Sequence, residues 1–151
     1  MSAKKYVSLI LVFILTITLS SCKERVCFED FKNYENDFEK AALFLCGINE
    51  TGNEQAVTIY IKNGDFMLEN KVISNSTVSA SIEKVSEKGF TYVKVYKDQI
   101  IFWKDETGYY GLMWVSPAGS LGTEEIQSLH NIKLRPLLGN WYEVGTALNS
   151  I

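Results

Sequence analysis

An apolar run near the beginning of the chain determines how much of the sequence is left to fold as a domain. The run extends from Tyr6 to Leu19 and follows two basic residues, Lys4 and Lys5. A helix that crosses the hydrocarbon core of a bilayer needs about 20 apolar residues, and this run is several residues too short before the polar residues that begin at Ser20. We therefore expect a targeting segment that is removed, rather than a retained transmembrane helix, and about 130 residues that fold.

The residues after the run read Leu19-Ser20-Ser21-Cys22. A basic end, a short apolar segment and small residues before a cysteine together resemble the signal peptide of a bacterial lipoprotein, with residues 1–21 as the peptide. The resemblance implies that Cys22 becomes the first residue, with a diacylglycerol on its sulfur and an acylated amino end, carrying fatty acids such as palmitate. Such acyl chains would hold the protein on a membrane.

The residue after this cysteine is Lys23. In lipoproteins of enteric bacteria this pattern is associated with the outer membrane. The resemblance therefore implies a protein of the bacterial cell envelope, anchored to the outer membrane and facing the periplasm. Sorting rules differ between phyla, so the inner membrane stays an alternative. A further alternative is an ordinary secretory signal, which would release a soluble protein in which Cys22 is merely the first of three cysteines.

The cysteine count favours lipidation. If Cys22 carries lipid, Cys27 and Cys46 remain as an even pair in an oxidising compartment, and we expect them to form a disulfide. A continuous helix between them would hold their Cα atoms about 28 Å apart, whereas a disulfide requires about 7 Å or less. The bond therefore needs a break in the helix, which Asn36 as a cap residue with Glu39 three positions later would provide. Without the bond, both thiols would be buried or reactive.

Apolar residues spaced three and four apart from Phe28 to Leu45 predict an amphipathic helix, which Gly47 would end. The remainder is rich in strand-forming residues, and Asn63-Gly64 is the strongest two-residue hairpin signal. We expect strands over residues 56–62, 66–68, 72–73, 77–85, 90–96, 100–103, 109–115 and 140–144, and a short helix over residues 124–129. The segment that contains Leu134, Leu137 and Leu138 has no assignment.

A helix followed by antiparallel strands predicts an α+β fold, in which the N-terminal amphipathic helix packs on a curled antiparallel sheet; a small β-barrel is the alternative. The expected organisation is the signal peptide, a short tether over residues 22–26 and a single globular domain over residues 27–151. The chain has 15 Lys and Arg against 18 Asp and Glu, and its basic residues form no run. This distribution argues against a nucleic-acid partner.

Residues that could carry out catalysis are scarce. His130 is the only histidine, which excludes a histidine-rich metal site and a paired-histidine acid–base mechanism. The sequence lacks the Gly-x-Ser-x-Gly motif of a serine nucleophile. Its adjacent carboxylates are better interpreted as solvated turn residues than as a converging catalytic pair. They are Glu29-Asp30, Asp105-Glu106 and Glu124-Glu125. We therefore expect no enzyme, no metal and no cofactor.

Aromatic residues are concentrated in the C-terminal strands, where neighbours within a strand point to opposite faces of a sheet. The face away from the helix should therefore display one of two sets, Tyr109 with Met113 or Tyr110 with Trp114. Exposed Tyr and Trp are common anchors of protein interfaces, although a core or a dimer contact would use aromatics equally. The candidate binding-surface residues are Tyr109, Tyr110, Trp114 and Trp141.

Two functional hypotheses follow from these expectations. The first is a lipid-anchored envelope protein that acts as a non-catalytic protein-binding module, for instance a periplasmic inhibitor or an immunity protein, with an envelope protein or a toxin as its partner. The second is a structural or accessory envelope lipoprotein whose strand-face aromatics line an apolar pocket for a lipid or a glycan.

Overall fold

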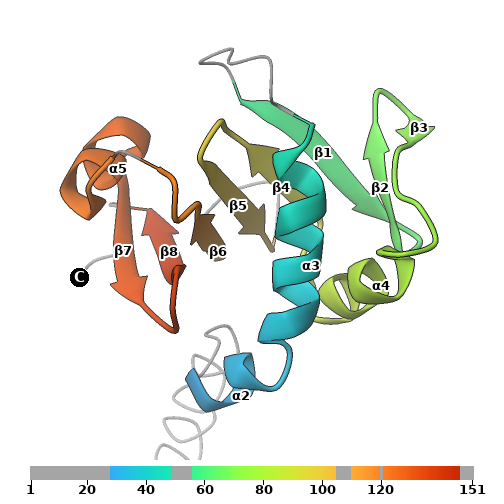
Figure 1. Cartoon of the computed structure of the whole chain (residues 1–151), viewed down its shortest axis with the longest axis horizontal. Helices are drawn as coiled ribbons and strands as arrows, with labels where there is room; N and C mark the ends of the chain where they lie inside the picture. The colour runs from blue at the N-terminus through green and yellow to red at the C-terminus, as the bar shows by residue number, and fades with distance from the viewer. Residues whose placement is uncertain (1–27, 49–55, 105–109, 120, 147–151) are drawn as a thin grey trace, which may run out of the picture.

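The computed structural model describes residues 28–48, 56–104, 110–119 and 121–146. Within these ranges an open antiparallel sheet carries helices on both faces (Figure 1). The helices are α2 (Phe28–Lys32), α3 (Glu35–Cys46), α4 (Ser79–Glu87) and α5 (Thr123–His130). The strands are β1 (Val57–Lys62), β2 (Asp65–Leu68), β3 (Lys71–Val72), β4 (Tyr92–Val95), β5 (Gln99–Trp103), β6 (Tyr110–Val115), β7 (Ile132–Pro136) and β8 (Trp141–Thr146).

The strand order across the sheet is β3-β2-β1-β4-β5-β6-β8-β7, and each neighbouring pair is antiparallel. The α+β prediction is therefore confirmed. The β-barrel alternative is wrong, because the sheet does not close: β3 and β7 are its two edges. The segment that the sequence left unassigned contributes the edge strand β7.

Helix α3 lies across one face of the sheet (Figure 1). The helical pattern from Phe28 to Leu45 is interrupted between α2 and α3, so a break does occur near the predicted position. Tyr34, not Asn36, precedes the first residue of α3, and it makes no side-chain capping bond. The buried side chains of α3 are those of Phe38, Ala41, Ala42 and Leu45.

Phe38 is at the centre of the core between α3 and the sheet. Its ring centroid lies 5.1 Å from that of Phe90, 5.2 Å from that of Phe102 and 5.9 Å from that of Trp141. Phe31 of α2 also lies 5.3 Å from Trp141. Such edge-to-face and tilted aromatic pairs stabilise a core beyond the area that they bury. One cluster of rings thus joins both N-terminal helices to strands from the middle and the end of the chain.

Residues 77–85, predicted as a strand, instead lead into and form most of helix α4. Val78, Ile82 and Val85 are buried on one side of it, a spacing of four and three residues that a helix aligns. The Asn75 side chain accepts hydrogen bonds from the amide and hydroxyl of Thr77, which shapes the turn that precedes the helix. The helical spacing of the apolar residues therefore describes this segment better than the alternation of apolar and polar residues that predicted a strand.

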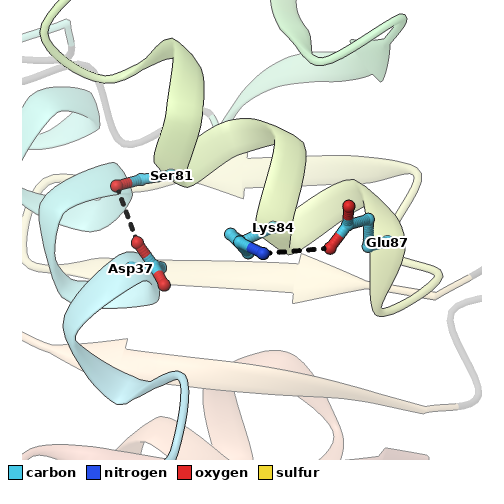
Figure 2. A network of polar contacts seen from close by, with 4 residues as sticks. All are labelled: Asp37, Ser81, Lys84 and Glu87. Carbon is cyan, nitrogen blue, oxygen red and sulfur yellow. Dashed lines mark hydrogen bonds and ion pairs between the residues drawn. The ribbon is translucent and has the colours of Figure 1, made fainter.

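A hydrogen bond joins α4 to α3. The Ser81 hydroxyl, which is buried, donates to Asp37 Oδ1 of α3 over 3.0 Å, and Figure 2 shows the two side chains turned toward each other. A hydrogen bond to a charged group contributes about 1.5–3 kcal/mol. The nearby Lys84–Glu87 ion pair, at 3.5 Å, lies within α4 and is more than half exposed, so it contributes little.

On the face of the sheet away from α3, one row of cross-strand neighbours runs across all eight strands. Successive cross-strand partners are Val72, Met67, Tyr60, Tyr92, Trp103, Gly111, Val144 and Leu134. The Trp103 ring lies against Gly111, where a Cβ atom would be 3.0 Å from Cε3 of the indole and would collide with the carbonyl oxygen of Phe102. The position therefore requires glycine.

We expect the substitution Gly111→Ala to lower the free energy of unfolding by about 1–3 kcal/mol, because the new methyl group forces the two central strands to shift. Gly145→Ala in the neighbouring strand β8 is the matched control. A Cβ atom there meets nothing within 4 Å, so the free energy of unfolding should change by no more than about 0.5 kcal/mol. Denaturant unfolding of both variants measures the difference. Equal effects would contradict the close approach at Gly111.

Candidate functional site

The predicted aromatic surface is largely core. Trp141 is 1 % exposed and Trp114 is 3 % exposed, so the prediction that these two residues form a binding surface is wrong. Tyr110 is half-buried and packs against the same cluster. The physical reason is the register of β6, which points Tyr110 and Trp114 toward α3. Tyr109 lies outside the described residues.

Met113 points away from α3, as in the alternative that grouped it with Tyr109, but it is fully buried. It belongs to a second apolar cluster with Ile101, Val144 and Ile126 of α5. Both faces of the central strands are therefore covered. The described strand aromatics in such positions stabilise the fold by filling its two apolar clusters.

An exposed apolar surface lies instead at the other end of the sheet, on β1 to β3. It consists of Tyr60, Met67 and Val72, which are direct cross-strand neighbours on the face away from α3; we refer to these three residues as the Tyr60 patch. Tyr60 is 53 % exposed, Val72 is 56 % exposed, and Met67 between them is half-buried. The Tyr60 ring lies 6.3 Å from that of Tyr92, which supports one side of the patch.

The sequence contains a signal that places Tyr60 on the face away from α3. In β1, Ile59 and Ile61 flank Tyr60 and pack toward α3, so alternation alone places Tyr60 on the opposite face. The Asn63-Gly64 turn then fixes the register that pairs Tyr60 with Met67. The sequence of β1 does not show that none of the described helices packs over this end of the face.

Both edges of the sheet are protected against the addition of another strand. Strand β3 has only two residues, and short edge strands are one way in which proteins avoid edge pairing. In β7, Pro136 has no amide hydrogen, and the outward amide of Leu134 donates to Gln127 Oε1 of α5 over 3.0 Å. A partner is therefore more readily bound on a face than at an edge.

A polar cluster joins the end of α5 to the turn between β4 and β5. The His130 Nε2–H donates to Oε1 of the buried Gln99 over 2.6 Å, and the imidazole lies 4.4 Å from the Tyr96 ring. Burial, and secondly the charge of Lys94, lower the pKa of His130. Burial also raises the pKa of the Tyr96 hydroxyl. The neutral imidazole is thus the form that this environment favours.

Cys46 is a free thiol at the end of α3 that is farther from α2 in the sequence, and its predicted disulfide with Cys27 stays a prediction. Cys27 itself lies outside the described residues, as does Cys22. Burial and the nearby Asp98 raise the pKa of the Cys46 thiol, which disfavours the reactive thiolate. Cys46 packs against the α3-side cluster, whereas His130 contacts side chains of the opposite face, so the two do not form a nucleophile–base pair.

Three carboxylates of the pairs predicted to be solvated have side chains that the structure describes. Asp30, Glu124 and Glu125 are exposed, and Glu125 accepts a hydrogen bond from the Gly122 amide as part of the start of α5. Residues 105 and 106 lie outside the described ranges. Among the residues that the structure describes, no group of three or more His, Cys, Asp or Glu side chains is placed to hold a metal ion.

A shallow surface depression of about 480 Å³ lies on the outer side of α5. Its lining residues are Leu121, Glu124, Glu125, Ser128 and Leu129. None of the aromatic residues predicted as a binding surface contributes to it. Within the described part of the chain, no helix has the length and apolar character needed to cross a bilayer.

Comparisons with known proteins found no matching family model, no matching curated protein and no matching solved structure.

The assignment of Trp141 to the core and of Tyr60 to the surface can be tested by measuring the stability of two variants. We expect Trp141→Ala to lower the free energy of unfolding by about 3–5 kcal/mol, because it empties the space that Phe31, Phe38 and Phe102 enclose. Tyr60→Ala should lower the free energy of unfolding by less than about 1 kcal/mol, because more than half of that side chain is already in water. Comparable losses in the two variants would contradict this assignment.

Proposed function

We propose that this chain is a lipid-anchored protein of the bacterial cell envelope that binds another protein and catalyses no reaction. The sequence Leu19-Ser20-Ser21-Cys22 behind a short apolar run supports the anchor. The partner would be an envelope protein or a delivered toxin, which makes the chain a periplasmic inhibitor or an immunity protein. The outer membrane, facing the periplasm, is the proposed location.

The observation that carries the binding role is the exposure of the Tyr60 patch. Tyrosine and methionine are enriched in protein interfaces, where they bury large areas and, for methionine, adapt in shape. The patch is small, so it would form the centre of an interface rather than the whole of one. The surrounding β1 residues Thr58 and Lys62 would supply polar groups at its rim. The pocket hypothesis gains no comparable support, since the strand aromatics fill the core.

The anchor is tested by the intact mass of the protein extracted from the membrane fraction. We expect a chain that begins at Cys22 and is heavier by a diacylglycerol and an additional acyl group. The variant Cys22→Ala is the control, and it should carry no lipid and stay unprocessed. A native chain that carries no lipid, or one that begins elsewhere, would contradict the proposed anchor.

The binding surface is tested by placing a photo-crosslinking amino acid at Tyr60 in cells. We expect one discrete adduct with another protein, because the patch is buried in the complex. The matched control is the same amino acid at Leu43, an apolar side chain of α3 that is 56 % exposed. The proposal requires the adduct at Tyr60 and its absence at Leu43. Identical products at both positions, or none at Tyr60, would contradict it whether or not Cys22 carries lipid.

A further inference from the structure

Helix α5 is held to the sheet by few interactions. Ile126 is its one fully buried side chain within the described structure, and Leu129 is 65 % exposed. Two side-chain hydrogen bonds complete the attachment, from the Leu134 amide to Gln127 and from His130 to Gln99. Figure 1 shows α5 beside β7 at one end of the sheet, away from α3 and α4.

What α5 covers is an edge strand and part of an apolar cluster. The outward amide of Leu134 would have no acceptor from the protein without Gln127, because β7 has a neighbour on one side only. Ile126 packs in the cluster that contains Ile101, Met113 and Val144. Removal of α5 would therefore expose both a strand edge and apolar side chains, which natural proteins keep covered.

We propose that α5 is a detachable cover of the β7 edge and that acid releases it through His130. This inference does not depend on the lipid anchor or on the Tyr60 patch. Among the described side chains that attach α5 to the sheet, the half-buried imidazole is the one that titrates.

The groups around His130 explain why its protonation would weaken the attachment. From β4, Lys94 adds a positive charge. The Tyr96 ring, in the turn after β4, adds an apolar surface, and Gln99 of β5 accepts the Nε2–H. The charged residues of β7 are on the other face, where Arg135 is paired with Glu143. Asp98 of the β4–β5 turn acts on Cys46. No carboxylate is among the contacts described for His130. The carbonyl end of α5, where His130 is the last residue, favours the imidazolium, whereas burial and Lys94 act against it and lower its pKa.

The direction of the pH effect follows from the lowered pKa. Because the attached state favours neutral imidazole, attachment is fully stabilised above the ordinary histidine pKa of about 6.5 and is progressively lost as the pH falls toward the lower value of the attached state. Each unit of difference between the His130 pKa in the attached state and the ordinary histidine pKa corresponds to a tenfold change in the equilibrium between attached and released α5.

Amide hydrogen exchange tests the proposal, with rates corrected for the intrinsic effect of pH. Between about pH 7 and about pH 5 we expect the protection of the Leu134 amide and of the α5 amides to fall several-fold. The amide of Phe102 in the central strand β5 should keep its protection. Unchanged protection at Leu134, or an equal loss at Phe102, would overturn the proposal.

Variants separate acid release from general destabilisation. His130→Gln keeps a donor for Gln99 but does not titrate, so its Leu134 protection should be independent of pH across this range. Gln127→Ala should lower Leu134 protection at both pH values. Lys94→Gln removes the second cause of the lowered pKa and should reduce the acid response, which gives a further test if His130→Gln fails to fold. An acid response that persists in full in His130→Gln would overturn the role of His130.

Discussion

The packing of Phe38 between α3 and the sheet is the interaction on which the remaining structure depends. Its ring contacts Phe90, Phe102 and Trp141 from three separate parts of the chain. A small domain has few large side chains with which to fill its core, so aromatic residues are used there first. This demand explains why Trp114 and Trp141 are buried and are not part of a recognition surface.

Local sequence patterns predicted most elements, and the exceptions have an identifiable cause. The Asn63-Gly64 turn has positive φ at both residues and forms the expected hairpin, because few other conformations suit that pair. In residues 77–85, the spacing from Val78 to Ile82 fits a strand and a helix equally. Only the step of three to Val85 distinguishes them, since a strand would point Val85 to the opposite face. That step favours the helix that forms.

The candidate site was less predictable than the fold because exposure depends on distant segments. Alternation divides a strand into two faces but does not show which face another element covers. Here α3 and α4 cover one face, and α5 reaches the other face only at its β7 end. Tyr60 is exposed because it lies at the end of the row that no described helix covers, whereas Trp103 in the same row is buried. Neither fact is a property of β1 alone.

An open sheet of eight strands has two edges, and this protein protects them by unequal means. The short strand β3 is protected by its own length, whereas β7 depends partly on a helix with one buried side chain. Elements with few buried apolar contacts open locally at a lower free energy than the whole domain unfolds. The aromatic cluster around Phe38 sets the stability of the α3 face, while the attachments of α5 set how well the β7 edge stays covered. The two properties are therefore able to respond separately to substitution and to pH.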